Sequence, residues 1–198
     1  MKTTILGLDV SSSCIGISIL SVENETISYI HSEYHKPLKT GNLFERLDKT
    51  KKVIINIIQT YKPDIIAIEE IIQFMKGSSG AKTIIALTTF NRTIGLAAYE
   101  TTSRPPEMYS VLQIRHGIRR AANLPKLPAK EELPDIIEKL LNFPFPWEYN
   151  KKGKKIVENY DRSDAICVGY YAALDLINKN KPIEPKKSKK KNGHKGSI

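Results

Sequence analysis

The hydrophobic positions at the start of the chain predict three strands. Residues 4–10 form an apolar run typical of a strand buried on both faces, and Asp9 interrupts this run near its carboxyl end. A polar turn at residues 11–14 precedes two further strand-like segments, 16–22 and 26–35, which are joined by a tight polar turn. The pattern predicts a three-stranded antiparallel meander.

The next part of the chain alternates between helical and strand-like patterns. Residues 43–61 carry apolar side chains at helical spacing, and Pro63 ends this helix. Residues 64–70 form a short apolar run that ends in two acids, which predicts a central strand parallel to the first. A long helix over residues 81–101 and a strand over residues 107–112 follow.

Helices dominate the last third of the chain. They are predicted over residues 113–122, over 129–141 with Pro134 inside, and over the strongly periodic segment 160–178, whereas residues 143–159 are expected to form a loop or insertion. Antiparallel strands followed by alternating helices and strands define an α/β fold with a mixed five-stranded sheet and flanking helices. Functional groups in such sheets gather beyond the carboxyl ends of the parallel strands.

The positive charge of the chain is concentrated at its C-terminus. The 198 residues carry a formal net charge of +10, and residues 179–198 contain eight Lys and one Glu. This segment has no apolar periodicity, so we expect one globular domain over residues 1–178 and a disordered Lys-rich tail over residues 179–198. Three roles suit the tail: a solvated end, a flexible arm on nucleic-acid phosphates, or a localisation signal.

The composition argues against a membrane or secreted protein. No apolar run approaches the roughly 18–20 residues of a transmembrane helix, and Asp9 comes before any signal-peptide core could form. Only two cysteines are present, Cys14 and Cys167, so no disulfide framework is implied. We therefore expect an intracellular protein in a reducing compartment.

Acids end both of the central parallel strands. Asp9 lies at the end of the first strand and Glu69 at the end of the second. Each acid alone is equally compatible with a turn, a cap or the solvated end of a strand. Because neighbouring side chains of a strand point to opposite faces, Glu69 and Glu70 are not expected to face the same site.

A second pair of acids lies at the start of the final helix. Asp161 and Asp164 are three residues apart, so they share one helix face. A structural role explains them as well, because Asp161 would be a good N-cap and Asp164 would complement the helix dipole.

Taken together, the four acids indicate a metal site. The chain has no His or Cys cluster in this arrangement, and carboxylates alone suit a hard cation such as Mg²⁺. Two such ions can activate water and stabilise the leaving oxygen of a phosphodiester. Acids packed this closely repel one another without metal, so at least one is expected to have a raised pKa.

The local sequences resemble the RuvC-like Holliday-junction resolvases of the ribonuclease H-like superfamily over residues 4–178. Ile5-Leu6-Gly7-Leu8-Asp9 followed by Gly16-Ile17-Ser18 is similar to the first hairpin of this family. Pro63-Asp64-Ile65-Ile66-Ala67-Ile68-Glu69 is similar to its Glu-bearing strand, and Asp161-Arg162-Ser163-Asp164-Ala165 to its closing acid pair. Tyr109-Ser110-Val111 through Arg115, and then Ala129-Lys130-Glu131-Glu132, resemble its strand and basic helical region.

The resemblance implies an Mg²⁺-dependent endodeoxyribonuclease that resolves four-way DNA junctions by paired symmetric nicks. Asp9, Glu69, Asp161 and Asp164 would be catalytic and would bind two Mg²⁺ ions, for which Mn²⁺ could substitute. Family members act as homodimers, and the helix over residues 81–101 would form the interface through its small residues Gly95, Ala97 and Ala98.

The resemblance also implies contacts with branched DNA. Basic positions of the family correspond to Arg115 and Lys130, although an ordinary solvated helix face also explains these two residues. The position of an aromatic wedge in the family is close to Ile72, with Phe74 nearby. The remaining candidates for DNA contacts lie in the same basic region: Arg119, Arg120 and Lys126. The insertion and the Lys-rich tail suggest a divergent viral, mobile-element or organellar-type member.

Three other functions are compatible with parts of the sequence. Residues 9–16 could imitate the first phosphate loop of an actin-like or sugar-kinase-like ATPase, but no second phosphate loop is visible. A nuclease-like scaffold could bind branched nucleic acid without cutting it, although all four carboxylates are present. A related enzyme could cut flaps or RNA–DNA hybrids.

Overall fold

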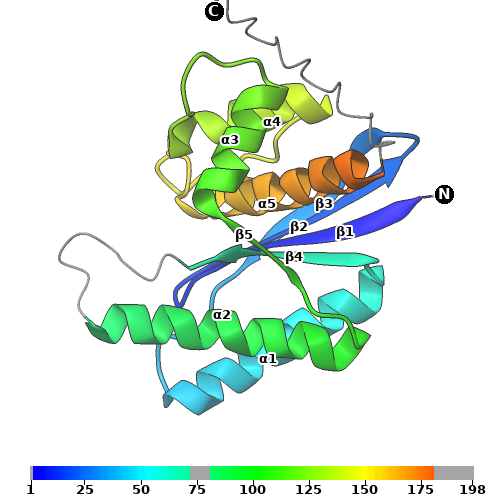
Figure 1. The fold of residues 1–198 in the computed structure, drawn as a ribbon. Helices are drawn as coiled ribbons and strands as arrows, with labels where there is room; N and C mark the ends of the chain where they lie inside the picture. Colours follow the sequence, from blue (N-terminus) through cyan, green and yellow to red (C-terminus); the bar gives the residue numbers. More distant parts are fainter. Residues whose placement is uncertain (1, 72–80, 181–198) are drawn as a thin grey trace, which may run out of the picture.

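A computed structural model describes residues 2–71 and 81–180 of the chain. Within these residues the protein is a five-stranded mixed sheet with helices on both faces (Figure 1). The strand order is β3-β2-β1-β4-β5. The predicted α/β class and the predicted mixed sheet are therefore confirmed.

The first three strands form the predicted meander. β1 (Thr3–Val10) pairs antiparallel with β2 (Ile15–Glu23), which in turn pairs antiparallel with β3 (Thr26–His35). β1 is the central strand, and its middle residues are fully buried, as the apolar run indicated. β3 lies at the edge of the sheet, and its first six residues alternate between exposed and half-buried.

The helix–strand alternation that follows also matches the sequence pattern. α1 (Leu43–Tyr61) leads into β4 (Ile65–Glu70), and α2 (Ala81–Thr102) leads into β5 (Glu107–Ser110). β4 runs parallel to β1, and β5 runs parallel to β4.

Two predicted boundaries near β5 and α4 are wrong for local reasons. The strand predicted over residues 107–112 ends at Ser110, because the Ser110 side chain caps α3 (Val111–Ala121) in a reciprocal capping box with Gln113. The helix predicted over residues 129–141 is divided into the 3-10 turn η1 (Lys130–Glu132) and α4 (Leu133–Leu141). Pro134 lies in the first turn of α4, where a missing N–H is tolerated.

The last helix, α5 (Glu158–Lys179), starts two residues earlier than the sequence pattern predicted. The segment between α4 and α5 contains an antiparallel bridge between Tyr149 and Lys155, so part of the predicted loop is ordered as a hairpin. No described helix is long and apolar enough to span a bilayer.

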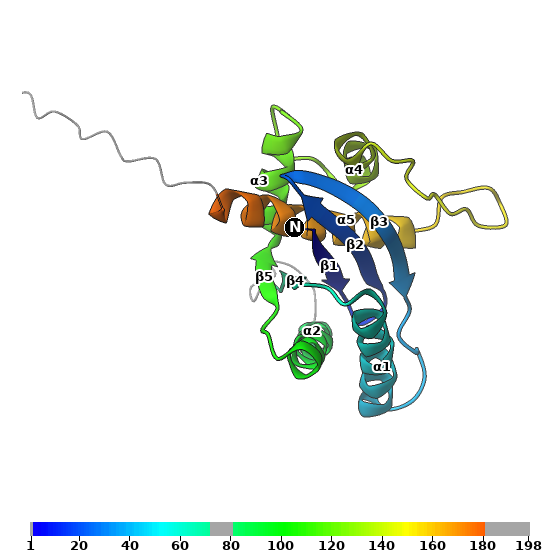
Figure 2. The ribbon, with the colours of Figure 1, turned by 90° about the vertical axis from the view of Figure 1, so that its right-hand side faces the viewer.

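The alternation of side chains along β1 and β4 divides the interior into two cores. On one face, Leu6 and Leu8 of β1 and Ile66 and Ile68 of β4 pack against α1 and α2. On the other face, Ile5 packs with residues of α3, α4 and α5. Figure 2 shows α1 and α2 on one side of the twisted sheet and the other three helices on the opposite side.

Glycines let α5 lie directly against β1 and β2. A Cβ atom at Gly7 would lie 2.5 Å from the backbone oxygen of Ala165, and one at Gly16 would lie 2.0 Å from that of Asp161. Between these positions, the Ser18 hydroxyl donates a hydrogen bond of 2.8 Å to the Ala165 carbonyl. The backbone of α5 therefore lies so close to the sheet that a side chain at either glycine position would overlap it.

Replacing Gly16 with alanine should displace the start of α5, because the new methyl group would overlap the backbone of Asp161. We expect Gly16→Ala to lower the free energy of unfolding by about 1–3 kcal/mol, as overpacking typically does. Chemical denaturation monitored by circular dichroism would measure this loss. Gly95→Ala is the control, since a Cβ there would meet only ordinary contacts at 3.8 Å and 3.9 Å; equal effects of the two substitutions would contradict the close-approach argument.

Some sequence predictions lie outside the described residues. The candidate wedge residues Ile72 and Phe74 belong to the segment 72–80, and most of the Lys-rich tail belongs to the segment 181–198. The predicted division into residues 1–178 and a tail stays a prediction, although α5 continues to Lys179.

Candidate active site

Strand register brings Asp9 and Glu69 to the same edge and the same face of the sheet. Leu8 of β1 is aligned with Ile68 of β4, so the next residue on each strand is an acid. Leu8 and Ile68 point into the core with α1 and α2. Side chains alternate along strands, so both acids point toward α5.

The start of α5 supplies Asp161 and Asp164 to the same place. The helix begins at Glu158 after Val157, and no side chain caps its first turn. Asp161 therefore lies inside the helix rather than at its N-cap, so the capping explanation for this residue is wrong. The one-turn spacing of the two acids directs both toward the carboxyl end of β1.

Three of the four predicted acids form a tight cluster. Carboxylate oxygens of Asp9, Asp161 and Asp164 all lie within 4.8 Å of one another. Glu69 is not a member of this cluster, but its charge raises the pKa of Asp9. The structure thus brings all four acids to one edge of the sheet, with Glu69 set slightly apart.

Lys130 is the cation closest to the cluster. Its Nζ atom lies 2.7 Å from Asp164 Oδ2 and 3.1 Å from Asp161 Oδ1. The Arg115 guanidinium of α3 lies farther away, 3.8 Å from Asp164 Oδ1, and also donates to the Pro128 carbonyl. Both residues contact the acids of the site, so they do not belong to an ordinary solvent-exposed helix face.

The acids raise one another's pKa values, as close packing of carboxylates predicts. Burial raises the pKa of Asp9 well above its usual range, and the charges of Glu69 and Asp164 raise it further. Burial and the charge of Asp164 raise the pKa of Glu69 to about 7, against the opposing effect of Arg115. Burial lowers the pKa of Lys130, but Asp164 and Asp161 together outweigh it and raise that pKa overall.

These shifts predict that the protein is least stable at alkaline pH when no metal is added. The pKa of Glu69 is raised from 4.5 to about 7, so its stabilising contribution is present below pH 4.5 and is lost as the pH rises to about 7. In a chelator, the melting temperature should fall between pH 5 and pH 8. Glu69→Gln should flatten this dependence, and a profile unchanged by that substitution would contradict the assigned shift.

A polar side chain of α2, which the sequence analysis missed, fixes the end of β4. The Asn91 amide donates a hydrogen bond of 2.9 Å to the Glu69 carbonyl, and Asn91 is 1% exposed. Asn91 lies among the buried residues Phe90, Ile94 and Ala97 of the same helix. Its position on the apolar face of a helix could have indicated this role, because a buried amide nearly always forms a hydrogen bond with another part of the protein.

The acids open into a cleft of about 250 Å³. Glu70 is exposed and lines this cleft together with Glu69. Glu70 is not among the charges that shift the pKa of Asp9 or Glu69, and the prediction that it faces away from the acids stays a prediction. The lining residues are Asp9, Val10, Ser11, Glu69, Glu70, Ile71, Leu87, Val111, Lys130 and Asp161.

The other basic residues predicted to contact DNA are not in the acidic cluster. Arg120 lies at the end of α3 beside Tyr171 and Asp175 of α5, and Lys126 lies in the loop beside Glu131. Arg119 is half-buried, and its Nε atom has no hydrogen-bond partner in the described part of the chain. Arg115 and Lys130 are thus the predicted basic residues that the fold places at the acidic cluster.

The donor set suits a divalent cation. The site contains three clustered carboxylates, a fourth carboxylate beside them and the Lys130 ammonium group between two of them. When all four acids are ionised, their negative charges repel one another. Oxygen-only ligands from Asp and Glu are those that Mg²⁺ and Mn²⁺ prefer. A sheet of this topology, with carboxylates at the carboxyl ends of β1 and β4 and on the last helix, matches the ribonuclease H-like class that the sequence resemblance implied.

Comparison with known proteins gives the family. Residues 5–150 match the family described as crossover junction endodeoxyribonuclease RuvC, and this chain belongs to that family. The RuvC endonuclease of Ehrlichia ruminantium (strain Gardel) is 28% identical over 167 residues, which cover 83% of this chain and 92% of the relative. That of Geotalea uraniireducens (strain Rf4) is 26% identical over 175 residues, covering 88% and 97%.

Solved structures share the fold at low sequence identity. Thermus thermophilus RuvC in complex with a Holliday junction superimposes with a TM-score of 0.65 at 17% identity, covering 88% of this chain and 96% of that one. The yeast mitochondrial Holliday junction resolvase Ydc2 superimposes with a TM-score of 0.59 at 11% identity, covering 89% and 82%. The predicted resemblance to RuvC-like resolvases is confirmed.

Proposed function

We propose that this protein is a structure-selective endonuclease that resolves four-way DNA junctions by metal-dependent phosphodiester hydrolysis. The observation that carries this proposal is the cluster of Asp9, Asp161 and Asp164 beside Glu69, at the sheet edge of a RuvC family member. Curated relatives of similar length are named crossover junction endodeoxyribonucleases, which supports a junction as the substrate.

The four acids would hold two Mg²⁺ ions, with Mn²⁺ as a substitute. Asp9 and Asp164 are the best placed ligands, because each is close to the other acids and has a pKa raised by burial. When bound, the ions supply an activated water and stabilise the leaving oxygen of the scissile phosphodiester. Glu69, held through its carbonyl by Asn91, and Asp161, held by α5, complete the ligand set.

The basic residues of the site have a separate role in this proposal. Lys130 neutralises Asp161 and Asp164 before substrate arrives and then faces a phosphate of the cleaved strand. Arg115, anchored through Pro128, offers a second cation at the same edge. DNA contacts by Arg119, Arg120 and Lys126 would lie outside this cleft and would bind the arms of the junction.

A panel of labelled substrates tests the proposal. Purified full-length protein with Mg²⁺ or Mn²⁺ should cut a synthetic four-way junction at paired symmetric positions and leave a linear duplex intact. Preferential cutting of a flap or of an RNA–DNA hybrid would instead favour a related ribonuclease H-like activity. Absence of cutting with either metal, despite tight junction binding, would favour a binding module.

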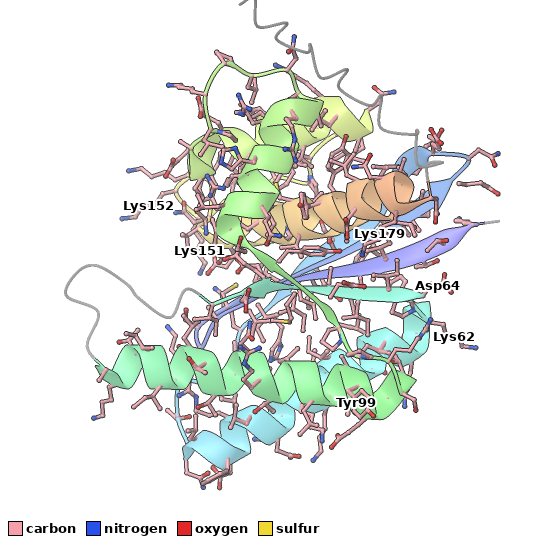
Figure 3. The ribbon with its side chains drawn as sticks, viewed as in Figure 1. Lys62, Asp64, Tyr99, Lys151, Lys152 and Lys179 are labelled. Atoms are coloured by element: carbon pink, nitrogen blue, oxygen red, sulfur yellow. The ribbon has the colours of Figure 1, made fainter. Side chains whose placement is uncertain are left out.

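We further propose that the protein acts as a homodimer through the outer face of α2. The predicted small residues do not form this face, since Ala97 and Ala98 are fully buried in the protomer and Gly95 faces Pro106 and Ile68. The exposed apolar residues of α2 lie instead at helical spacing on the opposite side: Ile85, Leu96 and Tyr99. Figure 3 shows the Tyr99 side chain on the outer side of this helix.

A charge on this face should separate the protomers. We expect Leu96→Glu to convert a dimer into a monomer, because the carboxylate would be buried against an apolar partner surface. Light scattering coupled to size exclusion measures the mass. Thr26→Glu, an exposed position on the edge strand β3 and away from α2, is the control, and a wild-type mass of one chain at micromolar concentration would contradict the proposed dimer.

A further inference from the structure

The segment between α4 and α5 carries a closed basic hairpin, residues 149–155. Its ends are joined by the bridge between Tyr149 and Lys155. Inside the turn, Asn150 Oδ1 accepts hydrogen bonds from the backbone N–H groups of Lys152 (2.9 Å) and Lys154 (3.1 Å). The Asn150 N–H donates to the Lys154 carbonyl at 2.8 Å. The basic hairpin is therefore an ordered turn with its own hydrogen bonds.

Buried polar side chains attach the base of the basic hairpin to α5. The Asn159 side chain of α5 donates to the Glu148 carbonyl (2.8 Å) and accepts from the Glu148 N–H (3.0 Å). Arg162, which is 4% exposed, binds the Glu148 carboxylate at 3.0 Å, the Asn159 side chain at 2.6 Å and the Pro146 carbonyl. These buried contacts fix the direction in which the basic hairpin leaves the body of the protein.

The same turn of α5 holds both the basic hairpin and the catalytic acids. Arg162, the anchor, lies between Asp161 and Asp164 in sequence. Because α5 begins at the edge of the sheet where β1 and β4 end, the basic hairpin and the acidic cluster lie at the same end of the molecule. Figure 3 shows Lys151 and Lys152 at this end, opposite Lys62, and Figure 2 shows the hairpin projecting beside the β3 edge.

The charge of the basic hairpin has no acidic counterpart. Four lysines and no acid lie between Asn150 and Lys155. Lys151, Lys152 and Lys154 are exposed, and none forms an ion pair within residues 2–71 and 81–180. The nearby Glu148 is already engaged by Arg162 and by the Tyr34 hydroxyl.

We infer that the basic hairpin binds the phosphate backbone of a duplex arm next to the cleaved strand. The inference rests on the proposed function, and it adds a contact surface on the β3 side of the site. A group of lysines attracts the negatively charged DNA backbone, and the counterions bound to the DNA are released when the lysines bind. Because the turn is already ordered, its lysines lose less conformational entropy on binding than those of a flexible tail would.

Charge neutralisation tests this contact. Lys151→Gln, Lys152→Gln and Lys154→Gln are combined in an Asp9→Asn background of the full chain, and junction affinity is measured from low to moderate salt. We expect the slope of log Kd against log salt to fall by about 2–3 and the affinity near 0.15 M salt to fall by about tenfold. Lys155 is left unchanged, because its Nζ lies 3.2 Å from the centroid of the Trp147 ring.

The matched control removes the same charge elsewhere. Lys2→Gln, Lys62→Gln and Arg104→Gln change three exposed cations that precede β1, β4 and β5, at the opposite end of these strands. We expect this control to keep the affinity within about twofold and the slope within one unit of the parent, as contacts far from the DNA should. Equal losses in the two triple variants, or an unchanged slope in the hairpin variant, would overturn the inference.

Intrinsic fluorescence gives an independent readout. Trp147 is the single tryptophan of the chain and lies beneath Lys155 at the base of the basic hairpin. Titration with a junction should shift its emission, and the hairpin triple variant should reduce that response. Suppose that wild type cuts the junction, but Trp147 emission does not change and the hairpin variant binds as tightly as its parent. This result would contradict the inference about the hairpin and leave the proposed function intact. Failure of wild type to bind or cut any junction would remove the proposed function as well.

Discussion

Asp9→Asn should abolish junction cleavage and leave junction binding intact. Asp9 lies within 4.8 Å of both α5 acids, so its loss removes a ligand from the centre of the site. We expect a fall in single-turnover cleavage of at least about a thousandfold, the scale on which loss of an essential catalytic group is measured. Binding should remain within a few-fold, because the basic residues that face phosphates are unchanged.

The same substitution should stabilise the protein in the absence of metal. Burial and the neighbouring acids raise the pKa of Asp9, so its ionised form is unfavourable in the folded state. At pH 8 in a chelator, Asp9→Asn should melt at a higher temperature than wild type, and Mg²⁺ should raise its melting temperature less. Wild-type cleavage by Asp9→Asn, or loss of its folded structure, would contradict the assignment of Asp9 as a ligand.

Lys130→Gln should cause the second largest loss. The ammonium group makes close contacts with Asp161 and Asp164, and glutamine would leave those carboxylates without their counter-charge. We expect cleavage to fall by about a hundredfold, comparable to removing one preorganised electrostatic group. Stability without metal should fall by about 1–2 kcal/mol, a reduced figure because the Lys130 side chain is 40% exposed.

Lys130→Arg is the control for charge, and Lys139→Gln is the control for position. Arginine keeps the positive charge, so stability without metal should be close to that of wild type. Lys139 lies in the last turn of the neighbouring helix α4, is exposed and has no ion pair in the described part of the chain, so its loss should change cleavage less than threefold. Equal cleavage by Lys130→Gln and wild type would show that this cation has no part in the reaction.

The sequence predicts most of this fold because local patterns and tertiary packing agree. The apolar run of β1 and the helical spacing of α1 and α2 each match one buried face, so their positions are readable without any partner. The position of Asp9 and Glu69 also follows from the sequence, since alternation along two parallel strands sends both acids to one face.

Other features depend on contacts between distant residues and were therefore not predictable. Asp161 looks like an N-cap until the segment before it is seen to continue the helix back to Glu158. The small residues Ala97 and Ala98 suggest an interface between protomers, but both are buried inside the protomer, on the face of α2 that packs against α1. Asn91 matters only because β4 ends opposite it, which the helical pattern alone does not show.

The close packing of α5 on Gly7 and Gly16 has a consequence for synthesis of the protein. The acids at positions 9 and 69 leave the ribosome long before Asp161 and Asp164, and the face of β1 that carries Gly7 is not covered by α5 until this last helix has been made. A nascent chain that ends before α5 thus holds only half of its ligand set. Cutting activity should accordingly appear only after α5 has been synthesised, so a chain that stops before Glu158 should not cut DNA.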